Sequence, residues 1–215
     1  SVEFTYMIPS GAISDQKNTG RCWLFTGLNV LRRRMVREYG IEDIEFSQVY
    51  LYFYDLLEKS NLFLQGIIDS RERPISDRMV EKLIARPIWD GGKINGFYDL
   101  VMKYGVMPRQ FMPETFSSFN STELKLILNL KLREDAIALR ECPAADCKVL
   151  KEKMIAEIYR ILALCLGEPP CEFEWSCAAA NVTESGKALP EGLHSYTPRE
   201  FYETFFGDDL RTKYV

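Results

Sequence analysis

Histidine is scarce in this sequence of 215 residues: His194 is the single one. Six cysteines are present, but the last five lack the close Cys-x-x-Cys spacing that is typical of zinc sites. Free thiols are the favoured interpretation of these five cysteines, with a zinc site or disulfides as alternatives: Cys142, Cys147, Cys165, Cys171 and Cys177.

Long apolar runs are also missing. No stretch of about 18 apolar residues occurs, so we expect no membrane span. The net charge is −4, which argues against a protein whose main task is to bind nucleic acid. The chain begins Ser-Val-Glu-Phe, without a charged and then apolar leader, so we expect no signal peptide and a cytoplasmic location.

One stretch carries a strong local pattern. A polar loop that contains glycine, residues 15–21, leads into Cys22 and Trp23. Apolar residues then recur every three or four positions, which predicts a helix over 22–39 that ends at Gly40: Phe25, Leu28, Leu31 and Met35. Cys22 therefore opens a helix, where backbone N–H groups and the helix dipole stabilise an anion such as a thiolate.

Gln16 stands six residues before Cys22. Its side-chain amide, together with the backbone N–H of Cys22, could donate hydrogen bonds to the oxyanion of a tetrahedral intermediate. A Gln, a short loop with glycine, then Cys-Trp is similar to the local pattern of papain-like cysteine peptidases. The upstream cysteine that papain-like peptidases usually carry in this loop is absent here.

The variant Gln-Lys-Asn-Thr-Gly-Arg-Cys-Trp-Leu-Phe resembles the bleomycin hydrolase and aminopeptidase C family, a branch of the papain superfamily. Further stretches in the same order resemble that family over nearly the whole chain: 45–54, 90–92, 103–108, 165–170 and 197–202. One departure is that Lys93-Ile94-Asn95 stands where the family usually has Gln-Trp-Asp after the Gly pair.

The resemblance implies an α+β papain-like cysteine peptidase fold, of which this chain is the mainly helical part. It implies that 1–118 is the papain-like helical part, with the cysteine and the Gly-Gly loop, and that 119–215 is a family-specific helical insertion. It also implies that Gly91, Gly92 and Trp23 bind a peptide substrate, that no metal or cofactor is needed, and that the protein forms a homo-hexamer. From the residues alone, a plain turn is the favoured interpretation of the Gly pair, and substrate binding is the alternative.

The remaining helices follow from periodicity and capping signals. Ser47 is a predicted N-cap of a helix to about residue 68, and Asp77 precedes a helix whose inward side chains are Met79, Val80, Leu83 and Ile84. Asn120 and Glu123 predict a capping box for a helix to about 140. Other predicted elements are helices over about 97–104, 149–166 and 198–206, a strand over 173–175, extended chain over 1–13 and a loop over 178–192.

A papain-like thiolate needs an imidazole that an Asn or Asp orients. His194 lies beyond the usual range of about 130–150 residues after the cysteine, in a predicted polar loop, and no Asn follows it. The resemblance implies that the catalytic His and Asn lie beyond Val215, in family members about twice as long. Two hypotheses follow: a thiol aminopeptidase, represented here by its nucleophile half, or a non-catalytic helical module that binds peptides or acts as a scaffold.

Overall fold

A computed structural model describes residues 14–41, 43–89, 91–176, 190–207 and 209–213 of the chain. The described residues are mostly helical, with one short two-stranded sheet. The elements are α1 Cys22–Tyr39, α2 Gln48–Asp69, α3 Arg78–Ala85, α4 Ile94–Tyr104, a 3₁₀ turn Arg109–Phe111, α5 Phe116–Phe119, α6 Ser121–Glu141, α7 Cys147–Leu166, β1 Phe173–Trp175, β2 His194–Tyr196, α8 Pro198–Phe205 and α9 Leu210–Lys213.

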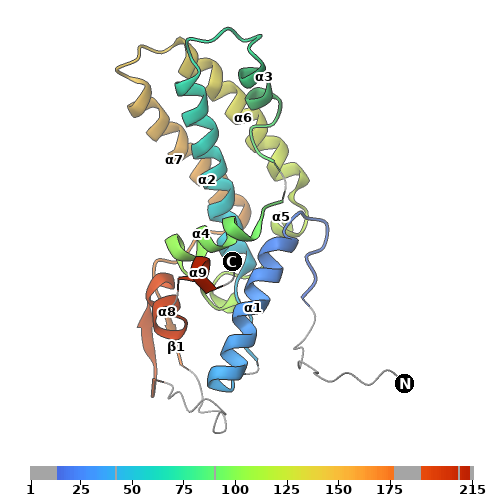
Figure 1. Ribbon diagram of the computed structural model, residues 1–215, viewed down its shortest axis with the longest axis vertical. Helices are drawn as coiled ribbons and strands as arrows, with labels where there is room; N and C mark the ends of the chain where they lie inside the picture. The colour runs from blue at the N-terminus through green and yellow to red at the C-terminus, as the bar shows by residue number, and fades with distance from the viewer. Residues whose placement is uncertain (1–13, 42, 90, 177–189, 208, 214–215) are drawn as a thin grey trace, which may run out of the picture.

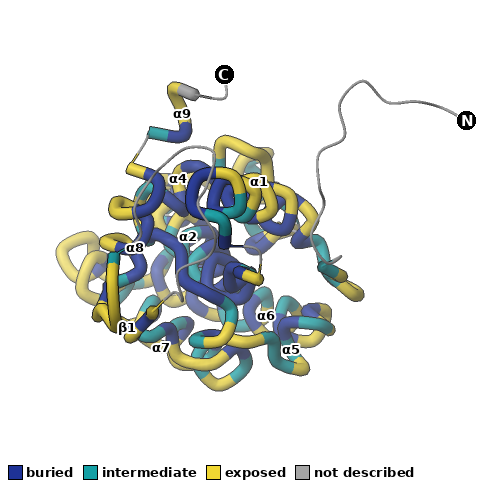
Figure 2. The backbone as a smooth tube through the Cα atoms, turned by 90° about the horizontal axis from the view of Figure 1, so that it is seen from below, coloured by how far each residue is buried: buried dark blue, intermediate teal, exposed yellow. Residues whose placement is uncertain are grey.

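Helix α2 runs through the middle of the structure and packs against helices in both halves of it. In one half it packs lengthwise against α6 and α7, and in the other half it packs against α1 and α4 (Figure 1). Buried residues gather around α2 and on the faces of the helices that turn towards it (Figure 2). The two halves therefore share one hydrophobic core, because α2 contributes to both.

The predicted limits of α1 are confirmed. Gly40 ends this helix with a left-handed backbone (φ 69°), and its N–H donates to the carbonyl groups of Met35 and Val36. Ser47 is also confirmed as the N-cap of α2, because its Oγ accepts a hydrogen bond from the N–H of Tyr50 (3.1 Å). The same hydroxyl donates to the carbonyl of Met112 (2.6 Å), which joins the start of α2 to the chain before α5.

Two predictions, one about the buried face of α3 and one about the cap of α6, are wrong. Met79 is 56% exposed, because α3 turns Val80 inward and has only one fully buried side chain. Asn120 does not cap α6 with its side chain. The capping box lies one turn earlier, at Thr115 and Ser118, and the short α5 that it begins already ends at Asn120.

The predicted strand β1 is confirmed, and its partner is a strand that the sequence did not predict. Strand β2 begins at His194, which was expected in a loop, and pairs antiparallel with β1 so that Phe173 lies opposite Tyr196. The ring of Tyr196 packs edge-on against Phe201 of α8. The predicted extended chain 1–13, Cys177 and most of the predicted loop 178–192 lie outside the described residues.

Cys142 and Cys147 lie together at the connection between α6 and α7, with their sulfur atoms 2.7 Å apart and both thiols free. Arg71 donates to Sγ of Cys147 (3.0 Å) and to the carbonyl of Cys142 (2.7 Å). Within the described part of the chain, no cluster of three or more His, Cys, Asp or Glu side chains has the arrangement of a metal site. Among those same residues, no helix has the length and apolar character needed to cross a membrane.

Candidate active site

Cys22 is the first residue of α1, and it is exposed. The carbonyl of Arg21, just before the helix, accepts hydrogen bonds from the N–H groups of Leu24 (2.9 Å) and Phe25 (3.1 Å). The N–H of Cys22 thus belongs to the first turn, where a helix offers no carbonyl of its own as acceptor. The thiol therefore sits at the positive end of the helix dipole, beside backbone N–H groups that can bind an anion.

Short-range hydrogen bonds fix the loop before Cys22. Lys17 has a positive φ of 54°, and its N–H donates to Oδ1 of Asp15 (2.8 Å). The hydroxyl of Thr19 donates to the carbonyl of Gln16 (2.8 Å). An isolated β-bridge between Asn18 and Asn120 then ties the loop to the junction of α5 and α6.

Gln16 is half-buried in this loop. Its Oε1 atom is buried, and no donor among the described residues forms a hydrogen bond with it. Buried polar atoms usually have a hydrogen-bond partner, so this oxygen is an exception. The structure therefore keeps Gln16 in the segment that leads to Cys22 and leaves its amide oxygen uncommitted to other described residues.

Arg21 fixes the start of α1 through a buried ion pair. Its side chain is fully buried, and its NH1 and NH2 atoms donate to the two carboxylate oxygens of Glu114 (3.0 and 2.9 Å). Its Nε donates to Oγ1 of Thr19 (3.2 Å), and its guanidinium lies over the rings of Phe25 and Tyr52. A bidentate pair of this kind fixes direction as well as distance, so it holds the residue that precedes Cys22 in one place.

Trp23 connects the cysteine to the Gly-Gly loop. A Cβ atom at Gly92 would lie 2.4 Å from Cε2 of Trp23, which is closer than side-chain atoms pack, so only glycine fits against this ring. The neighbouring Gly91 has a positive φ of 77°, a conformation that favours glycine for a different reason. The structure therefore brings three of the predicted site residues together next to Cys22. Asp90, the residue before this Gly pair, lies outside the described residues.

Lys59 of α2 joins this cluster from the interior. It is buried, and its Nζ donates to Oδ2 of Asp55 (2.7 Å) and to the carbonyl groups of Gly91 (2.9 Å) and Trp89 (3.3 Å). The same ammonium lies 5.8 Å from the ring centre of Trp23 and 5.2 Å from that of Trp89. Lys59 thus links α2, the start of α1 and the Gly-Gly loop.

A second carboxylate fixes the chain further upstream. Glu45 accepts hydrogen bonds from Ser14 Oγ (3.0 Å), Gln48 Nε2 (3.2 Å) and Arg109 NH1 (2.7 Å). Burial raises the pKa of Glu45, but the hydrogen bonds from Arg109, Gln48 and Ser14 outweigh it and leave that pKa below its usual value. The charged form therefore holds the segment that leads to Gln16.

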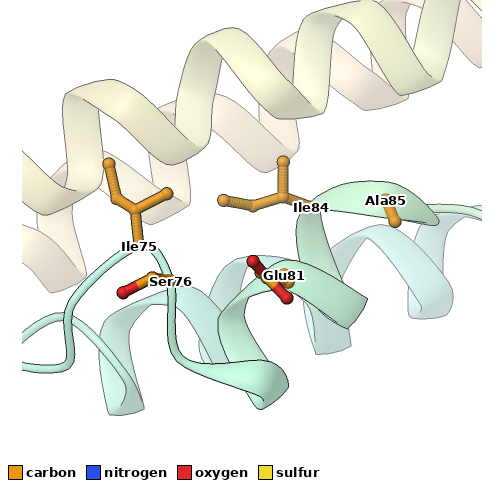
Figure 3. Close-up of a pocket in the computed structure, with 5 residues that line it drawn as sticks. All are labelled: Ile75, Ser76, Glu81, Ile84 and Ala85. Atoms are coloured by element: carbon orange, nitrogen blue, oxygen red, sulfur yellow. The ribbon is translucent and has the colours of Figure 1, made fainter.

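A hollow on the surface lies elsewhere, at α3 (Figure 3). It is lined by Ile75, Ser76, Glu81, Ile84 and Ala85. Figure 1 places α3 near the C-terminal ends of α2 and α6, away from α1. No cysteine lines this hollow, and it lies away from Cys22, so it is not the candidate active site.

The sequence of residues 1–215 matches the model of the Peptidase C1-like family. The chain belongs to this family. Aminopeptidase C of Listeria monocytogenes is 38% identical over 97% of this chain and 46% of the relative. Bleomycin hydrolase of Gallus gallus is 36% identical over 80% of this chain and 40% of the relative.

A solved structure with similar sequence shows the same fold. The crystal structure of PepW from Lactobacillus rhamnosis superposes with a TM-score of 0.85 at 38% identity, over 98% of this chain and 47% of that one. The predicted papain-like fold, represented here by its mainly helical part, is confirmed. The chain spans about half the length of the curated relatives it matches.

His194 lies on a different part of this peptidase-like fold. Its Nε2 is 2.8 Å from the carbonyl oxygen of Glu191, and its exposed ring lies beside Tyr196. Strand β1, with which it pairs, lies next to α8 and is separate from α5 in both views (Figures 1 and 2). The loop before Cys22 is bridged to the end of α5, so His194 is placed away from the candidate nucleophile.

Three residues that shape this site had no predicted role in it: Arg21, Lys59 and Glu114. A signal for Lys59 was present, because Asp55 and Lys59 stand four residues apart in a helix rich in apolar residues, where charged residues are expected to be paired. Arg21 and Glu114 are far apart in sequence, and their spacing carries no periodicity. Only the folded chain shows that they meet.

Proposed function

We propose that this chain carries the nucleophile of a cysteine-type aminopeptidase. A base takes the proton of the Cys22 thiol, and the sulfur attacks the carbonyl carbon of the substrate's peptide bond. The C–N bond then breaks, a thioester forms, and the same base, now protonated, gives its proton to the leaving amine. Water then hydrolyses the thioester and restores the thiol. The observation that carries this proposal is an exposed cysteine at the N-terminus of α1, next in sequence to Trp23, whose ring lies against Gly92, in a chain whose relatives include aminopeptidases C.

The oxyanion of the tetrahedral intermediate is bound by the N–H of Cys22 and the side-chain amide of Gln16 in this proposal. The position of Cys22 in the first helical turn supports the first donor. The loop that holds Gln16 is held by the Thr19–Gln16 hydrogen bond and by the bridge from Asn18 to Asn120. This supports the second donor, because a catalytic group must be held in place before the reaction.

Peptide substrate binds along Gly91 and Gly92, with Trp23 as the supporting ring behind them. The absence of side chains at both glycines lets a second backbone approach closely. The open space around the missing Cβ of Gly91 is compatible with such an approach. No metal or cofactor takes part in this mechanism.

The catalytic imidazole and its orienting Asn come from a segment outside residues 1–215. The contacts of His194 with Glu191 and Tyr196, and its position on β2, support this part of the proposal. We assign 1–118 to the papain-like helical part and 119–215 to the helical insertion. A cytoplasmic homo-hexamer remains part of the proposal, on the strength of the family resemblance.

The test is aminopeptidase activity of the complete protein with an aminoacyl-coumarin amide as substrate. Cys22→Ala should abolish turnover and keep the fold, because alanine is well tolerated in a helix. Gln16→Ala should lower kcat by about 100- to 1,000-fold, the usual loss for one oxyanion donor. Cys171→Ala, at another exposed free thiol, is the matched control and should keep full activity.

Substantial turnover in the Cys22→Ala protein would contradict the nucleophile assignment. Absence of turnover in the wild-type complete protein would instead favour the alternative hypothesis of a helical module that binds peptides without cleaving them. A change confined to KM in Gln16→Ala would instead assign Gln16 to substrate binding.

A further inference from the structure

Lys59 is a charged residue in a place where charge is costly. It is 7% exposed and lies on α2, whose other buried residues are mostly apolar. A buried ammonium must be paired and hydrogen-bonded to be tolerated. Asp55, one turn earlier on α2, supplies the opposite charge at 2.7 Å.

The pairing with Asp55 uses only one of the three N–H donors of the ammonium. The other two reach out of α2 to the carbonyl groups of Gly91 (2.9 Å) and Trp89 (3.3 Å). The rings of Trp23 and Trp89 both lie within about 6 Å of the same ammonium, the usual range of cation–π contacts. The three donors of Lys59 thus have acceptors, and two of these acceptors are backbone groups of the segment around the Gly pair.

The hydrogen bond from Lys59 to the Gly91 carbonyl also determines where the N–H of Gly92 points, because both groups belong to the same peptide. A trans peptide is planar, and its C=O and N–H point in opposite directions. The carbonyl of Gly91 points inward to Lys59, so the N–H of Gly92 points away from Lys59. Glycine on both sides of this peptide would otherwise permit rotation, because neither residue has a Cβ that restricts its backbone.

We propose that Lys59 is a positioning residue that locks the Gly91–Gly92 peptide plane, with the Gly92 N–H turned outward as a donor to a backbone carbonyl of the peptide substrate. This inference rests on the proposed function of the Gly pair. Lys59 itself does not touch the substrate. It acts by fixing the loop before the substrate arrives, which lowers the conformational cost of binding.

The direct test is hydrogen exchange in the complete protein. Lys59→Met alone would leave Asp55 as an uncompensated buried charge, so the main variant is the double substitution Asp55→Asn with Lys59→Met, which removes both charges. We expect faster exchange of the backbone amides at 91–93, with unchanged protection in α1 and α6. Lys59→Arg keeps the charge and the donors, and it should restore slow exchange.

The kinetic test uses the same variants with the aminoacyl-coumarin amide. The double variant should raise KM by about tenfold, which corresponds to about 1.4 kcal/mol of binding, while kcat changes much less. Lys59→Arg should return KM to within a few-fold of the wild-type value. A purely structural role would instead lower the folded fraction without a selective rise in KM.

Unchanged exchange at 91–93 in the folded double variant would overturn the inference, whatever the activity. Faster exchange with an unchanged KM would also overturn it, because the loop would then not matter for binding. Failure of the proposed function is seen separately, as wild-type turnover that survives Cys22→Ala. The two outcomes are distinguishable, since one concerns the order of the loop and the other the nucleophile.

Discussion

At the scale of single residues, the position of Cys22 depends on a buried guanidinium next to it in sequence. Arg21 and Glu114 have side chains that are 0% and 4% exposed. We expect Glu114→Ala to destabilise the complete protein by about 3–5 kcal/mol, because it leaves Arg21 as an uncompensated buried charge. Denaturant unfolding followed by circular dichroism measures this change.

The matched control for this prediction is Glu203→Ala. Arg199 and Glu203 form an ion pair at the same distance of 2.9 Å, but both side chains are more than half exposed. Removal of that pair should cost at most about 1 kcal/mol. Equal effects of the two substitutions would mean that burial of the Arg21–Glu114 pair does not govern the start of α1.

The limits of sequence analysis are visible at these same residues. Cys22 could be placed at a helix start because the apolar period begins just after it and Gly40 ends it. The contact between Trp23 and Gly92 could not be found, since no periodicity relates residues so far apart. Arg21 carried no local sign that its charge would be buried, because arginine is usually exposed.

At the scale of elements, long periodic helices were predicted well, and the helices of only four residues were not. Helices α2 and α7 have many apolar positions and begin or end at clear signals, Ser47 and Gly167. In contrast, α5 is only four residues long and α9 is equally short. Elements of this length gain little from their own hydrogen bonds, so tertiary contacts decide whether they form.

Strand β2 was missed for a related reason. Three residues, of which two are exposed, give no alternation that can be recognised. Its pairing with β1 depends on an aromatic cluster with α8, in which Phe173, Tyr196 and Phe201 pack together. Such a cluster forms only after distant segments meet.

The connection between α1 and α2 should make stability depend on pH through Glu45. The pKa of Glu45 is lowered in the folded protein, so its contribution to stability is present above the unfolded pKa of about 4.3 and is lost as pH falls through the folded value. We expect Glu45→Gln to lower stability at about pH 6 by at most about 1 kcal/mol, because the side chain is partly exposed and solvent screens it. The difference from wild type should vanish towards about pH 3.

Thermal unfolding at a series of pH values measures this dependence. Glu172→Gln, at an exposed side chain, serves as the control and should follow the wild-type curve. A Glu45→Gln protein whose deficit persists or grows on acidification would show that the charge of Glu45 is not what holds Ser14 and Arg109.

At the scale of the whole molecule, the two proposed parts do not have separate hydrophobic cores. Buried residues of α1 and α4 belong to one continuous cluster with those of α6 and α7. Helix α2 contacts members of both groups, which makes it the common support. The Gly-Gly loop, which Lys59 joins to this same helix, is therefore coupled to the helical insertion through packing on α2.

The last prediction concerns how reactive Cys22 is within this chain. A helix N-terminus contributes up to about 2 kcal/mol to an adjacent negative charge, which corresponds to a rate advantage of about 30-fold for a thiolate reaction. An imidazolium partner adds far more, and papain-type thiols remain reactive well below pH 6. We therefore expect Cys22, in residues 1–215 expressed alone, to react with iodoacetamide at about pH 5 no more than about 30-fold faster than the exposed Cys171. Mass spectrometry of the two peptides gives both rates in one sample, and circular dichroism confirms that the helices are present.

A Cys22-to-Cys171 rate ratio of a thousandfold or more would mean that a cation of this chain pairs with Cys22. His194→Ala would then decide whether that cation is the histidine, since loss of the excess rate in this variant would place the catalytic base within the chain.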